Sequence, residues 1–153
     1  MNERFLFRGR RYDNGEWITG WITSQFKKFT EGKVLTYIKS NVFGGGEHLV
    51  NTKTVGQCTG LKDKNGKPIF EGDILRVITG NGWSCPKGTK VYYEVVFTEF
   101  NKECATWAEY IGFMAKREED NLDSIHYIVN SHGAEVIGNV YDNPELLQRS
   151  DEE

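Results

Sequence analysis

The sequence has few of the residues that hold disulfide-rich or zinc-binding domains together. Its three cysteines, Cys58, Cys85 and Cys104, are odd in number and have no CxxC spacing, which argues against a disulfide framework and the common zinc sites. No segment approaches the ~20 apolar residues that a membrane helix needs. Residues 1–11 are charged rather than arranged as a signal peptide. We therefore expect a cytoplasmic protein with reduced thiols, no cofactor and no membrane partner.

The chain also has only three prolines, and no stretch has the length and period of a long amphipathic helix. A parallel sheet with helical crossovers is therefore not expected. Instead, 17 glycines separate short stretches rich in Val, Ile, Thr and aromatic residues, which is typical of many short strands. The pattern predicts a mainly β fold. Its antiparallel strands are expected to form a small barrel or a twisted open sheet, with at most one or two short helices.

The length of 153 residues suits one core better than two small ones. We expect a single β domain over residues 1–147, followed by an acidic, disordered tail over residues 148–153. The net charge of −3 argues against a protein whose whole surface is built to contact phosphate.

Two asparagine-glycine pairs mark expected hairpin turns. Asn14-Gly15 lies within the β-prone stretch 10–23, and Asn65-Gly66 lies within residues 61–70. Asn-Gly readily adopts the positive φ angles of a type I′ turn. We therefore predict a two-residue turn at each pair.

The second half of the chain predicts further strands and one ambiguous segment. Residues 91–97 are the most β-prone run, and residues 106–115 are expected to pair with them antiparallel. Residues 122–129 have apolar side chains at helical spacing, with Asp120 or Asn121 as a cap and Gly133 as a stop. A short helix is favoured there, although a strand also fits.

Several strings are more specific than these general patterns. They are Phe7-Arg8-Gly9, Asp13-Asn14-Gly15-Glu16-Trp17, the run from Thr54 to Gly66, the run from Ile69 to Ile74 and the run from Val136 to Leu147. In order and spacing they resemble the YopX family of phage and prophage proteins. The resemblance implies a mostly β fold and a phage or prophage origin in bacteria, and it implies no catalytic residues.

The glycine, Asx and glutamine residues of these strings are interpreted as turn formers rather than ligand-binding residues. Glycine accepts tight corners, and short polar side chains hydrogen-bond to nearby backbone amides. The turn residues are Asn14, Gly15, Gly56, Gln57, Gly60, Asp63, Asn65, Gly66, Gly72, Asp73, Gly138 and Asn139.

No metal-binding or catalytic set is predicted. An EF-hand loop counted from Asp63 would place Gly66 at the fourth position and Ile74 at the twelfth, where glycine at the sixth and an acid at the twelfth are required. The histidines, His48, His126 and His132, have no further ligands at zinc spacing. A thiolate nucleophile at Cys58 or Cys104 stays an alternative, but an inert buried cysteine is favoured.

The basic residues near the start of the chain are candidates for nucleic-acid contact. They alternate with aromatic residues, and cations bind phosphates while rings stack on bases. An edge strand with rings inward and arginines in water gives the same alternation and is the favoured interpretation. The candidate contacts are Arg8, Arg10, Arg11, Lys27 and Lys28.

The sequence therefore favours a non-enzymatic interaction or assembly protein of phage biology, bound to a protein partner or to itself. The reason is that the sequence has many aromatic residues and many short strands but no recognisable set of catalytic residues. The alternatives are a nucleic-acid-binding module that uses the arginine-rich start and, with least support, a small enzyme or enzyme inhibitor.

Overall fold

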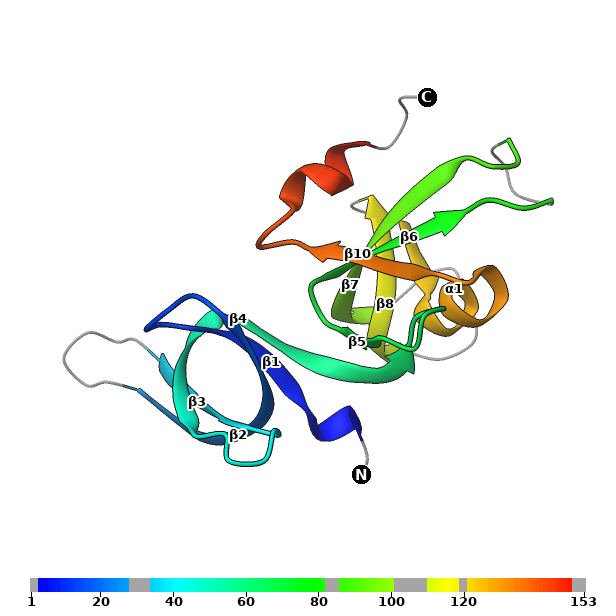
Figure 1. Ribbon diagram of the computed structural model, residues 1–153. Helices are drawn as coiled ribbons and strands as arrows, with labels where there is room; N and C mark the ends of the chain where they lie inside the picture. The colour runs from blue at the N-terminus through cyan, green and yellow to red at the C-terminus, as the bar shows by residue number, and fades with distance from the viewer. Residues whose placement is uncertain (1–2, 28–33, 82–85, 101–109, 119–120, 150–153) are drawn as a thin grey trace. The chain divides into compact units, whose positions relative to one another are not determined.

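The computed structural model of the protein describes residues 3–27, 34–81, 86–100, 110–118 and 121–149. These residues are mainly β, and their strands pair antiparallel in two sheets (Figure 1). The prediction of a mainly β, antiparallel fold is confirmed. In the described part, no helix is long and apolar enough to span a membrane.

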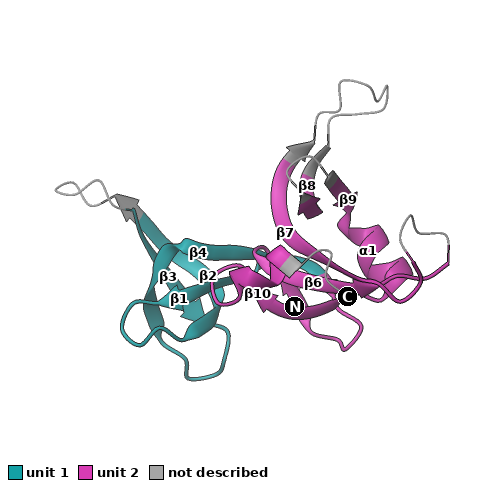
Figure 2. Cartoon of the chain, turned by 90° about the horizontal axis from the view of Figure 1, so that it is seen from above, with its two compact units in different colours: residues 1–60 teal, residues 61–153 magenta. Residues whose placement is uncertain are grey.

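The chain divides into two compact units, residues 1–60 and residues 61–153 (Figure 2). The single domain expected over residues 1–147 stays a prediction. The expected tail begins inside a 3-10 helix that ends at Arg149, and residues 150–153 lie outside the described residues.

Four strands of unit 1 pair in a closed ring. Strand β1 pairs with β2 on one side and with β4 on the other, while β3 joins β2 to β4. No strand of this ring is therefore left with only one partner. The elements are η1 (Glu3–Phe5), β1 (Phe7–Arg11), β2 (Trp17–Lys27), β3 (Val34–Ser40) and β4 (Glu47–Lys62), of which the last two residues belong to unit 2.

The register of the ring is interrupted at Ile22–Ser24 of β2, opposite β3, and more strongly between β1 and β4. Arg8 lies opposite Gly56 and Arg10 lies opposite Asn51, so four residues of β4 lie opposite one residue of β1. The Thr54 hydroxyl spans the break, because it accepts a hydrogen bond from the Arg10 amide at 2.9 Å and donates to the Asn51 carbonyl at 2.7 Å. This irregularity prevents the ring from being a regular barrel.

The interior of the ring is filled by a small apolar cluster. Ile38 and Val50 are fully buried, and Ile18 is nearly so. Three partly buried side chains from β1, β2 and β4 pack against them. These side chains alternate with outward-facing ones along the strands, as expected for a sheet with one buried face. The flanking residues are Phe7, Ile22 and Val55.

Unit 2 contains an open sheet with the strand order β10-β6-β7-β8-β9. The short β5 pairs with the end of β4 instead. The bounds are β5 (Pro68–Phe70), β6 (Asp73–Ile78), β7 (Lys90–Phe100), β8 (Tyr110–Glu118), β9 (Asn121–Ser124), α1 (Ile125–His132), β10 (Glu135–Asn139) and η2 (Pro144–Arg149).

Helix α1 supplies one side of the unit 2 core. Its buried residues Ile125, Ile128 and Val129 join a cluster with the inward faces of β6, β7, β8 and β10. The ambiguous segment is thus a strand followed by a helix, because β9 occupies its first half. The expected caps at Asp120 and Asn121 are wrong, since the N-cap is Ser124. Gly133 ends the helix with φ +60°, as predicted.

Both expected hairpins form, but neither has a two-residue turn. Five residues, 12–16, separate β1 from β2, and five residues, 63–67, separate β4 from β5. In the first turn the Arg11 amide donates to the Glu16 carbonyl at 2.9 Å, and in the second the Asp63 amide donates to the Lys67 carbonyl at 2.9 Å. Side-chain acceptors inside each loop stabilise these longer turns, which the Asn-Gly rule alone does not anticipate.

Gly20 provides a test of the unit 1 ring. A Cβ atom at this position would overlap the backbone carbonyl of Lys39 on the neighbouring strand. We expect Gly20→Ala to lower the free energy of unfolding by about 2 kcal/mol or more, as for overpacking against atoms that cannot move. Urea denaturation measures the change. Gly46→Ala is the matched control, since its nearest neighbour, a His48 ring atom, would lie 3.6 Å away. An equal loss in both variants would contradict the close packing of β2 on β3.

Candidate functional site

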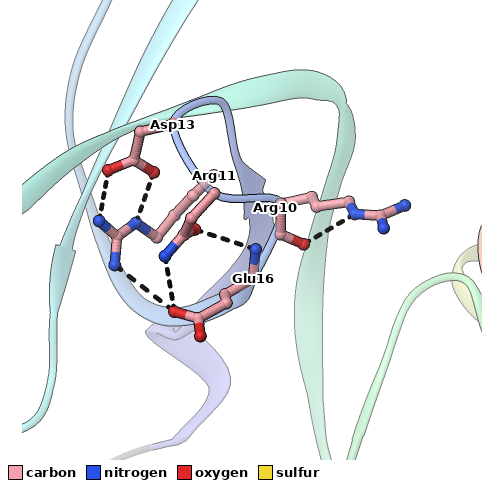
Figure 3. A network of polar contacts seen from close by, with 6 residues as sticks. Arg10, Arg11, Asp13 and Glu16 are labelled. Atoms are coloured by element: carbon pink, nitrogen blue, oxygen red, sulfur yellow. Dashed lines mark hydrogen bonds and ion pairs between the residues drawn. The ribbon is translucent and has the colours of Figure 1, made fainter.

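The predicted arginines lie on the first hairpin of unit 1, but they do not act as one cluster. Arg11 is held by the hairpin's own carboxylates (Figure 3). Its guanidinium makes two hydrogen bonds to Asp13 and lies 3.8 Å from a Glu16 oxygen. The Asn14 side chain orients Glu16, accepting its amide at 3.0 Å and donating to its carboxylate at 2.7 Å. The hydrogen bonds from Arg11 lower the pKa of Asp13.

Arg8 and Arg10 lie on the other side of β1 from Gly9, whose Cβ would face the ring interior. The Arg8 guanidinium carbon lies 4.9 Å from the centre of the Trp17 ring, which is a cation–π distance. Arg10 is exposed, and its Nε donates to the Gly15 carbonyl at 2.8 Å. The other two candidates are Lys27 and Lys28. Lys27 is the last residue of β2, and only its backbone is described. Lys28 lies outside the described residues.

Asp63 is a buried carboxylate that joins two distant segments of unit 2. One oxygen accepts the amides of Asn65 at 2.8 Å and Lys67 at 2.9 Å, and the other accepts the amide of Val136 in β10 at 3.1 Å. Burial raises the pKa of Asp63, but the three amides favour the charged form and bring the pKa below its usual value. All of these donors are backbone groups, so the carboxylate acts as a structural acceptor.

Other residues of the turn set also contact backbone. The Asp73 carboxylate accepts the Phe70 amide at 2.9 Å across the corner that contains Gly72, where φ is +80°. The Asn139 side chain accepts the amides of Tyr141 and Asp142, both at 3.0 Å. These bonds fasten the corners before β6 and after β10.

The other predicted turn residues in these strings, four glycines and one glutamine, differ from one another in backbone conformation and in packing. Gly60 and Gly66 have φ near +80°. A Cβ at Gly138 would meet the Asn143 side chain at 2.5 Å, so this glycine is required by close approach. Gly56 and Gln57 do not form a corner, because they lie inside β4, opposite Arg8 and Phe7 of β1. The register break of β4 takes the place of the turn that was expected there.

The described residues contain no group of three His, Cys, Asp or Glu that could hold a metal ion. Cys58 is fully buried in β4, whereas Cys85 and Cys104 lie outside the described residues. His132 packs edge to face on Tyr127, with ring centres 4.7 Å apart. His126 is exposed and His48 half-buried.

The turn between β3 and β4 exposes two apolar side chains, Val42 and Phe43, that were not among the predicted site residues. Phe43 is fully exposed, and Val42 is 69% exposed. The turn is closed by a hydrogen bond from the Gly45 amide to the Val42 carbonyl at 2.9 Å and by one from the Val42 amide to the Ser40 hydroxyl at 3.2 Å. The apolar turn, residues 42–43, is therefore presented by an ordered backbone. Its position before three consecutive glycines was the available signal.

Comparison with known proteins identifies the family. The family model described as YopX protein matches residues 6–148, which is nearly the whole chain. The chain belongs to the YopX family. The YopX resemblance of the sequence strings is thereby confirmed. Among solved structures, the crystal structure of protein EF1440 from Enterococcus faecalis is similar, with 24% sequence identity over 92% of this chain and 96% of that chain and a TM-score of 0.45. No curated protein matches the chain.

Asp63 can be tested by removing one acceptor. In Asp63→Asn the side chain keeps a single acceptor oxygen and turns an NH₂ group toward a backbone N–H, so at least one buried amide loses its partner. We expect a loss of about 1–3 kcal/mol in the free energy of unfolding, measured by urea denaturation. Asp123→Asn, a half-buried position on β9, is the control. A neutral Asp63→Asn variant would show that the carboxylate does not join β10 to the turn.

Glu135 gives unit 2 a defined acid sensitivity. Hydrogen bonds from Lys64 at 2.7 Å and Arg76 at 2.9 Å lower its pKa to about 2, from 4.5. A lowered pKa in the folded state stabilises the protein above the unfolded pKa, and the contribution disappears as pH falls from 4.5 toward 2.

We therefore expect Glu135→Gln to lower stability at pH 7 and to have a progressively smaller effect at pH 4 and below, because the wild-type group becomes neutral there. Urea denaturation at several pH values measures the difference. Glu145→Gln, an exposed position in η2, is the control. A stability difference for Glu135→Gln that does not change with pH would contradict the ion pairs.

Proposed function

We propose that this YopX protein is a non-enzymatic binding protein that associates with a protein partner or with a second copy of itself through the apolar turn of unit 1. The observation that carries the proposal is the full exposure of Phe43 beside the 69% exposed Val42. An interface owes most of its binding energy to a few buried anchor residues, aromatic side chains among them. A hydrogen-bonded turn that presents Phe43 next to Val42 is suited to insertion into a partner's pocket.

The buried carboxylates of unit 2 support a binding role over an enzymatic one. Asp63 and Asp73 both accept backbone amides at 2.8–3.1 Å. A catalytic acid or base must reach a reacting proton, whereas these groups fasten turns. We further propose that the protein works without a cofactor, in the cytoplasm of a bacterium that carries phage or prophage genes.

The apolar turn can be tested by a double substitution. Val42→Ser with Phe43→Ser should leave the free energy of unfolding within about 0.5 kcal/mol of wild type, since both side chains are exposed. It should abolish association. Sedimentation equilibrium over a range of concentrations measures self-association, and a photo-reactive amino acid at position 43 captures a partner for identification by mass spectrometry.

Tyr127→Ser is the control, because this 54% exposed side chain of α1 lies in the other unit. The same photo-reactive group at position 127 is the second control. A protein that remains monomeric at every concentration and forms no crosslink specific to position 43 would overturn the proposal.

A further inference from the structure

A second surface of unit 1 combines positive charge with indole rings. We call it the Arg/Trp face. It is formed by side chains from three neighbouring strands, at positions that alternate with the buried ones. Its members are Arg8 and Arg10 of β1, Trp17 and Trp21 of β2 and Lys39 of β3.

The register places these side chains on one side of the sheet. Arg10 is the direct cross-strand partner of Trp17, and Trp21 is the direct partner of Lys39. Between them along β2, Ile18 and Gly20 are buried. Successive side chains of a strand point to opposite faces, so the five members of the Arg/Trp face point away from the ring interior.

The two indoles are held at a fixed separation on one strand. Trp17 and Trp21 are four residues apart, which corresponds to about 13 Å along a strand. Both are half-buried, so part of each side chain is accessible to solvent. The Arg8 guanidinium carbon lies 4.9 Å from the Trp17 ring centre. The exposed Lys39 is the cross-strand partner of Trp21 on one side and of Glu47 on the other.

The charge of the chain is divided between the two units. Unit 1 contains nine Lys and Arg against five Asp and Glu, a net +4, while unit 2 contains ten against 17, a net −7. Charges farther apart than about 8–10 Å are largely screened at physiological salt. The overall charge of −3 is the sum of a basic unit 1 and an acidic unit 2, so it does not by itself exclude an anionic ligand of unit 1.

We infer that the Arg/Trp face binds single-stranded nucleic acid. Unpaired bases stack on Trp17 and Trp21, and Arg8, Arg10 and Lys39 contact the phosphates. Alternating stacking rings and cations on an exposed sheet is the arrangement used for single strands without strong sequence preference. A duplex hides its base faces, so it gains only the phosphate contacts. Arg11 is not included, because Asp13 and Glu16 bind its guanidinium.

The test measures fluorescence anisotropy of a labelled oligothymidylate of about 16 nucleotides in low salt. Wild-type protein should bind it, and affinity should fall steeply as salt is added. Trp21→Ala should weaken binding at least about fivefold. Arg10→Gln and Lys39→Gln are surface changes that preserve the fold, and each should reduce the slope of log affinity against log salt by about 1.

The controls separate this face from general charge and from the apolar turn. Lys90→Gln and Tyr127→Ala, both in unit 2, should bind as wild type does, and so should the Val42→Ser/Phe43→Ser double variant. Any failure of the proposed protein association therefore leaves this inference unaffected, and the reverse also holds.

Three results would overturn the inference. The first is no anisotropy change at low salt, and the second is an equal loss in Lys90→Gln. The third is competition by an equally charged polyglutamate or by a duplex as effectively as by unlabelled oligothymidylate, which would mean that charge alone, and not base stacking, governs the face.

Discussion

A carboxylate in the interior of a protein is stable only if its oxygens are hydrogen-bonded, and Asp63 meets this requirement with three backbone amides. Two of the amides belong to its own turn and the third belongs to Val136, 73 positions later. The Lys64 amide adds a bond to the Ala134 carbonyl at 3.0 Å. The chain is thus fixed where it leaves helix α1 and enters β10.

Other features of unit 2 depend on that junction. Glu135, the first residue of β10, can meet both Lys64 and Arg76 because the turn and the strand are already joined by the Asp63 carboxylate. The Asp63 carboxylate, together with the Lys64 amide, joins this turn to the segment that enters β10. The string from Thr54 to Gly66 and the string from Val136 to Leu147 are therefore physically connected through a single side chain.

The sequence predicted the fold class because that information is local. β-prone runs, glycine punctuation and the absence of helical period do not depend on distant contacts, and the helix stop at Gly133 follows from one residue's conformational freedom. The register break of β4 against β1, which places Gly56 opposite Arg8, could not be predicted, since it depends on the pairing of segments far apart in the sequence. The salt bridges of Arg11 could not be predicted either. In the sequence Arg8, Arg10 and Arg11 are equivalent positive charges, and only the conformation of the hairpin places Arg11 beside Asp13 and Glu16.

The ring of unit 1 also has a kinetic consequence. Phe7 pairs with Gln57, 50 positions later, so β1 acquires its second neighbour only after the whole intervening chain has been made. Closing a long loop costs entropy before its contacts compensate, and such non-local pairing slows folding. The N-terminal end of a chain is synthesised first. The hairpin of β1 and β2 can therefore form early, but β1 cannot pair with β4 until residues 47–62 have been made. Until β4 has been made, β1 therefore has β2 as its single neighbouring strand, and the edge of β1 that later pairs with β4 has no strand to bind.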